Sequence, residues 1–224
     1  MRPLGRRNPP EPVILVGMDA RRSYLDTTDA VTELVSRVKP ELLDGPGLGT
    51  WNLRSLIGHT SRAMSTVVTY LDRPADAVTC EDAVAYYVWV ATGPDVNAEI
   101  ARRGVEEGVA LTTHEKVRVK FAKRGRAVRK ALDAVPLDSD PIISTLAGGM
   151  YLSEYLPTRT FELIVHGFDI ARAADIPFAP HPGAVADTAA LAARVGCALG
   201  HAEVLIPALT GRTKWAGRSV FASA

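Results

Sequence analysis

The stretch Arg-Thr-Phe-Glu-Leu-Ile-Val-His-Gly-Phe-Asp-Ile at residues 159–170 decides the fold of this chain. Its apolar residues cover most of the circumference of a helix, so the spacing predicts a largely buried helix over residues 152–174. The polar residues of the stretch follow one another at spacings of three, four and three and share one face of that helix: Arg159, Glu162, His166 and Asp169. Ionised groups are costly to bury unless they are paired or bind a metal. This face is therefore the first candidate for a functional site.

Apolar residues recur at intervals of three and four on both sides of this stretch, which predicts further helices. We expect them at about residues 19–38, 50–73, 114–135 and 182–199, separated by turns rich in proline and glycine. Residues 80–93, with three aromatic side chains, are interpreted as part of the core. Residues 137–149 are expected to form a turn and a loop, and residues 204–206 a short strand. The fold class predicted is all-α, an up-and-down four-helix bundle core with extra helices.

The polar face has two interpretations. Glu162 and His166, four residues apart, project side by side and can both reach one metal ion. Alternatively, the face forms ion pairs along the helix, Arg159 with Glu162 and His166 with Asp169 or Arg172. His59 lies at the edge of the apolar stripe of the helix at 50–73, where it is either a core histidine or a third ligand. Two imidazoles and one carboxylate suit a divalent ion, and zinc would keep an open coordination position.

Composition narrows the classes of protein. The chain has 224 residues, of which 47% are hydrophobic and 23% charged, as expected of a globular domain with at most a small appendage. The net charge of +1 gives no general attraction to a polyanion, and no apolar run reaches the ~18 residues of a membrane span. The only cysteines, Cys80 and Cys197, cannot form a disulfide scaffold, so we expect a cytoplasmic protein with reduced thiols and no membrane partner.

Residues 116–130 contain eight basic side chains in fifteen positions. Such a run is consistent with a phosphate-binding face, but the chain as a whole is nearly neutral. The apolar heptad pattern accounts for the remaining positions of this helix. We therefore interpret the basic run as a solvated outer face and do not expect a nucleic-acid partner.

The segment Thr50–His59 (TWNLRSLIGH) resembles the first signature of the mycothiol-dependent maleylpyruvate isomerase, DinB-like family. Arg159–Ala171 (RTFELIVHGFDIA) is similar to the second signature, and Leu209–Arg212 (LTGR) to a tail motif of its shorter members. The resemblance covers roughly residues 19–220. It implies a DinB-like four-helix core that holds a divalent metal, commonly zinc, through the positions here numbered His59, Glu162 and His166. It also implies that mycothiol is the thiol cosubstrate and binds the metal as thiolate.

The expected organisation is a flexible tail at residues 1–18, which begins with an arginine- and proline-rich segment, a DinB-like metal-binding bundle at 19–180, and a C-terminal helix and tail packed on the bundle at 181–224. Either Met1 or Met18 can be the natural start. The isomerase itself carries a further α/β domain after the bundle, whereas fewer than sixty residues follow His166 here. We therefore expect this chain to share the metal site of the family, and we make no prediction from the resemblance about whether it catalyses the isomerisation of maleylpyruvate.

The function expected is that of a zinc-dependent, thiol-using enzyme, a mycothiol-dependent isomerase or transferase that acts on a small electrophile. Arg159 and Asp169 would assist catalysis by orienting the metal ligands or balancing charge. The alternative is a non-catalytic bundle with a regulatory role that binds a metal or a small ligand. The expected partners are the electrophile and a low-molecular-weight thiol, and the expected oligomeric state is a monomer or a homodimer.

Overall fold

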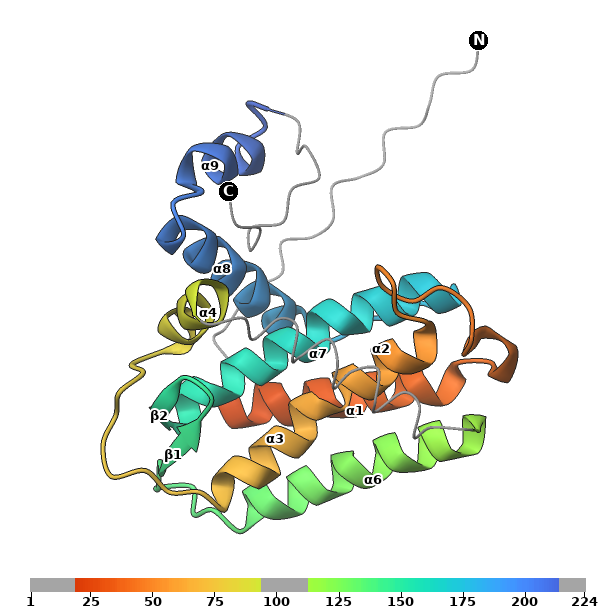
Figure 1. Cartoon of the computed structure of the whole chain (residues 1–224), viewed down its shortest axis with the longest axis horizontal. Helices are drawn as coiled ribbons and strands as arrows, with labels where there is room; N and C mark the ends of the chain where they lie inside the picture. The colour runs from red at the N-terminus through yellow and green to blue at the C-terminus, as the bar shows by residue number, and fades with distance from the viewer. Residues whose placement is uncertain (1–18, 94–112, 214–224) are drawn as a thin grey trace.

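The computed structural model describes residues 19–93 and 113–213. The core is built from α1 (Ala20–Arg37), α2 (Leu53–Thr60) with α3 (Arg62–Leu71), α6 (His114–Asp133) and α7 (Leu152–Ala174), which lie side by side (Figure 1). A single 3-10 turn, Pro40–Leu42, follows α1 in the described chain. The helix α8 (Pro182–Ala198) packs on α7 and on α4 (Ala83–Thr92), and α9 (Ala202–Leu209) packs on α8. The predicted all-α bundle with extra helices is confirmed.

The core forms where the apolar residues of these helices meet. The largest fully buried side chains include Tyr24 and Leu34 of α1, Phe121 and Leu132 of α6, and Tyr155 of α7. Burial of a leucine or phenylalanine side chain of this kind stabilises the fold by about 1.5–3 kcal/mol relative to an exposed one. None of the described helices is both long enough and apolar enough to cross a membrane.

The predicted helix at residues 50–73 is interrupted. Asn52 caps its first turn, as expected of a residue of this type, by accepting a hydrogen bond from the Ser55 amide at 2.9 Å. The helix then breaks between α2 and α3 at Ser61, whose hydroxyl donates to the Gly58 carbonyl at 2.6 Å. The Thr60 hydroxyl donates to the Leu56 carbonyl in the same way at 2.7 Å. Hydroxyls that bond back to a preceding turn compete with the helical ladder and bend it.

Two predictions of local structure were wrong. Most of the turn and loop expected at residues 137–149 belongs to an antiparallel hairpin of β1 (Ile142–Thr145) and β2 (Gly148–Tyr151). The hairpin is completed by tertiary contacts, because the Gly149 carbonyl accepts from the amides of Thr79 and Cys80 at 2.9 and 3.0 Å. The expected strand at residues 204–206 lies instead within α9.

The basic run of α6 is partly used within the bundle. Arg129 pairs with Asp29 of α1 at 2.6 Å, and Arg124 donates to the hydroxyl of Ser61. Lys123 and Arg126 are exposed, as a solvated face requires. The helix therefore matches the predicted solvated face at some positions and serves as a packing partner of α1 and α3 at others.

Gly167 lies where α7 meets the segment after it. A Cβ at this position would come within 2.6 Å of the Phe178 ring. We expect Gly167→Ala to destabilise the protein, because the cost of overpacking, typically 1–3 kcal/mol, exceeds the ~1 kcal/mol that alanine gains in helix propensity. Gly125→Ala in α6 is the matched control, since its nearest contact would be Thr32 Oγ1 at 3.4 Å. Urea unfolding measures both, and equal stability of the two variants would contradict the packing described here.

Candidate metal centre

The structure brings together the three residues that the resemblance implied as ligands. His59 comes from α2, and Glu162 and His166 lie one turn apart on α7. One ligand atom from each residue lies within 4.8 Å of the others. Helix α2 packs directly on α7, and this contact places His59 opposite the Glu162–His166 pair.

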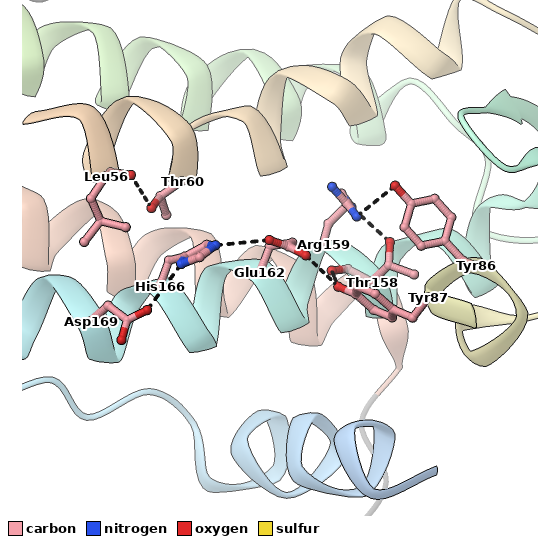
Figure 2. A network of polar contacts seen from close by, with 9 residues as sticks. All are labelled: Leu56, Thr60, Tyr86, Tyr87, Thr158, Arg159, Glu162, His166 and Asp169. Carbon is pink, nitrogen blue, oxygen red and sulfur yellow. Dashed lines mark hydrogen bonds and ion pairs between the residues drawn. The ribbon is translucent and has the colours of Figure 1, made fainter. Parts of the chain in front are cut away.

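Glu162 and His166 are held in position by further contacts along α7 (Figure 2). His166 Nε2 lies 3.3 Å from Glu162 Oε2, and His166 Nδ1 lies 3.4 Å from Asp169 Oδ2. Asp169 in turn accepts a hydrogen bond from the exposed Arg172 at 3.2 Å. The ion-pair interpretation is therefore right for His166 with Asp169, and it does not exclude the metal interpretation. A carboxylate on the second nitrogen of a ligating histidine is the usual way to orient the ring.

Burial and charge set different protonation states for the three residues. Burial lowers the pKa of His59 to about 4, with repulsion from His166 adding to the effect, so this imidazole is neutral near pH 7. Burial opposes the charged form of His166, but hydrogen bonds to Asp169 and Glu162 outweigh it and raise its pKa to about 9. Burial likewise disfavours ionised Glu162, yet the His166 hydrogen bond and the Arg159 charge hold its pKa well below the usual range.

The donor set fits a divalent metal ion. The buried Nδ1 of His59 has no hydrogen-bond partner among the described residues, and an orphaned nitrogen of this kind is uncommon in a folded protein. The His59 ring also lies 4.7 Å from Trp51 and 5.0 Å from His166, centroid to centroid. A neutral imidazole, a carboxylate and a second imidazole are the ligands of zinc sites that keep an open position. Protonated His166 carries one N–H on each ring nitrogen, so its Nε2 faces Glu162 and its Nδ1 faces Asp169.

Tyr87 is a contributor that the sequence did not reveal. It was interpreted as a core residue, and it is indeed buried on α4. Its hydroxyl, however, lies 2.8 Å from Glu162 Oε1 and 2.9 Å from the Thr158 carbonyl, so it shares its proton between them (Figure 2). Nothing in the spacing of residues 75 positions apart points to this contact.

We expect Tyr87→Phe to lower metal affinity on the order of 10-fold, because Glu162 loses the donor that orients its carboxylate. The phenyl ring stays, so the packing against Phe161, 4.9 Å away between centroids, is retained. Competition with a chelator measures the affinity. Tyr70→Phe is the control, because it makes the same substitution at a half-buried tyrosine of α3. Equal metal affinity of both variants would show that Tyr87 does not position Glu162.

Arg159 is buried on α7 but contacts none of the three candidate ligands directly. Its Nε donates to Thr158 Oγ1 at 2.9 Å and its Nη2 to the Tyr86 hydroxyl at 3.3 Å (Figure 2). Its guanidinium also lies over the rings of Tyr86 and Tyr155, 5.3 and 5.0 Å from their centroids. The expected ion pair of Arg159 with Glu162 does not form.

Fold and site together define a DinB-like helical bundle with a candidate His-Glu-His metal centre. The sequence model of the family described as the mycothiol maleylpyruvate isomerase N-terminal domain matches residues 24–171, which include all three candidate ligands. The chain belongs to this family. No curated protein and no solved structure matches the chain.

Proposed function

We propose that this protein is a metal-dependent enzyme that uses mycothiol, or a closely similar low-molecular-weight thiol, to isomerise or conjugate a small electrophile. The observation that carries the proposal is the convergence of His59, Glu162 and His166 within 4.8 Å, inside the region that matches a mycothiol-related family. A bound divalent ion, with zinc the metal proposed, would supply an open coordination position and lower the pKa of a thiol that enters it.

The surrounding residues of this chain would keep the site in one geometry. Tyr87 holds one oxygen of Glu162, while Asp169 holds the ring of His166. Both contacts are largely withdrawn from water, which strengthens the electrostatic interactions that orient the ligands. Arg159 adds a fixed positive charge one helical turn from Glu162.

Two measurements on the full chain test the proposal. Elemental analysis of the purified protein is expected to find about one divalent ion per chain. Mycothiol-dependent consumption of maleylpyruvate or 1-chloro-2,4-dinitrobenzene is then expected for the loaded protein and not for Glu162→Gln, which keeps the shape of the side chain without its charge. A loaded protein that binds thiol but turns over neither electrophile would instead be a metal-binding bundle with a regulatory role.

A further inference from the structure

A cavity lies on the side of α7 that faces away from the candidate metal centre. It measures about 250 Å³ and is bounded by α1, α4, α7 and α8. Thr160 of α7 lines it, whereas Glu162, two positions further along the helix, belongs to the metal centre and extends toward α2 (Figure 2). Each residue turns a helix by about 100°, so residues two apart lie on nearly opposite sides. The cavity and the metal centre are therefore separate sites.

Buried hydroxyl groups belong to the walls of this cavity. Thr188 of α8 is 8% exposed, and its buried hydroxyl has no hydrogen-bond partner among the described residues. Such an unpaired hydroxyl is uncommon in a folded protein, because it costs free energy unless a partner is bound. Thr160 donates its own proton to the Leu156 carbonyl at 3.2 Å, so its lone pairs remain to accept a hydrogen bond. These hydroxyls suit a polar ligand that donates hydrogen bonds.

The charged side chains around the cavity favour a cation. Two carboxylates line it, the half-buried Glu154 of α7 and the exposed Asp187 of α8. The only cation of the described lining, Arg194, forms an ion pair with Asp82 at 3.1 Å. Burial and the nearby carboxylates of Asp82 and Asp140 raise the pKa of Glu154, although Arg194 attracts its charge. A second cation beside Glu154 would therefore stabilise the ionised carboxylate.

An anion finds less support in the same place. The first turns of α1 and α4 border the cavity, and helix N-termini generally favour negative charge. Asp19, however, already accepts from the Arg21 amide at 3.1 Å, and Asp82 accepts from the Ala85 amide at 2.8 Å. Carboxylates of this chain thus already meet the charge of both helix ends.

The remaining walls and the size of the cavity limit the ligand further. Between the polar groups the lining is apolar, with Ala20, Ala83, Pro157 and Leu191. The volume of about 250 Å³ is below the roughly 300–1,000 Å³ of pockets for drug-sized ligands. A short apolar chain that ends in an ammonium group fits both limits, since its three N–H donors suit carboxylates and hydroxyls.

We infer that the cavity between α1, α4, α7 and α8 is a binding site for a small organic ammonium ion. The ammonium group contacts Glu154 and the Thr188 hydroxyl, and the apolar chain lies against the alanine, proline and leucine side chains of the lining. The site is additional to the candidate metal centre, and the inference does not depend on the proposed function.

Binding of n-butylammonium and of its neutral isostere 1-butanol to the full chain tests the site without requiring turnover. Titrations at neutral pH, followed by saturation-transfer NMR, are expected to show that n-butylammonium binds on the order of 10-fold more tightly. The reason is that hydrogen bonds to a charged group are roughly twice as strong as those between neutral groups. Butyrate, which has a similar shape and the opposite charge, is expected to bind more weakly than either.

Two substitutions locate the ammonium ion in the cavity. Glu154→Gln keeps the shape of the side chain and is expected to abolish the preference for the cation, whereas Glu33→Gln at an exposed position of α1 is expected to retain it. Thr188→Val removes the unpaired hydroxyl and is expected to weaken binding of n-butylammonium by roughly 2–10-fold. Thr69→Val, at an exposed threonine of α3, is the control for the loss of a hydroxyl. Circular dichroism establishes that each variant is folded.

A comparison of the protein before and after treatment with a chelator separates this site from the metal centre, because an amine can also coordinate a metal ion. The affinity for n-butylammonium is expected to be the same in both samples. A loss of binding after removal of the metal would place the amine on the ion and overturn the inference.

Three further outcomes would overturn it. Equal binding of n-butylammonium and 1-butanol to the wild-type protein would show that the cavity does not select a cation. A preference that survives Glu154→Gln combined with Asp187→Asn would place the ammonium ion elsewhere on the surface. An unchanged affinity in Thr188→Val would place it outside the cavity.

Discussion

Replacement of His59 by alanine is expected to remove most of the bound metal, and Glu162→Ala and His166→Ala are expected to do the same. A three-ligand site that loses one member loses chelation, so the affinity should fall by more than the roughly 10–100-fold typical of residues that only support the ligands. His59→Ala is the most informative of the three, because His59 alone comes from outside α7 and no described residue bonds to its Nδ1.

Metal content per chain, measured by elemental analysis after dialysis, checks this expectation. His201→Ala is a matched control, since His201 precedes α9 and its side chain caps nothing there. Circular dichroism establishes that each variant is folded. Full metal occupancy in His59→Ala would mean that α2 contributes no ligand and that the three-residue site is wrong.

The second large effect is expected at the open coordination position. Addition of mycothiol, or of N-acetylcysteine as a mimic, to the cobalt-substituted protein should produce a thiolate-to-cobalt charge-transfer band. Free thiols have a pKa of about 8.5, and a divalent ion deprotonates a coordinated thiol. Binding should therefore release close to one proton per thiol at neutral pH when water is displaced, which a weakly buffered calorimetric titration measures.

N-acetylserine is the control for the cobalt experiment, because it has the same shape as N-acetylcysteine and lacks the sulfur. If addition of the thiol produces no charge-transfer band, a fourth side chain already occupies the open coordination position. Asp169 would be the first residue to examine, although in the structure it contacts the far nitrogen of His166. That result would contradict the enzyme hypothesis and favour a metal-binding bundle with a structural or regulatory role.

The contrast between α7 and the hairpin shows what limits prediction from sequence. The predicted bounds of α7, residues 152–174, agree with the structure because long apolar periodicity and local helical hydrogen bonds both act within the segment. The strands β1 and β2 have four residues each and no alternating pattern. Their pairing depends on contacts with residues 73–80, among them the amide of Thr79, which local sequence cannot reveal.

The sequence by itself determined the helical class, the polar face of α7 and, through two family signatures, the three candidate ligands. These follow from properties that are local to a segment, namely the 3.6-residue period and the identity of residues at i and i+4. Only the tertiary structure decided that the Tyr87 hydroxyl donates to Glu162 and that Arg159 donates a hydrogen bond to Tyr86 rather than to Glu162. Those contacts join residues more than 70 positions apart, and their geometry is decided by how α4 packs on α7, a relation that no single segment encodes.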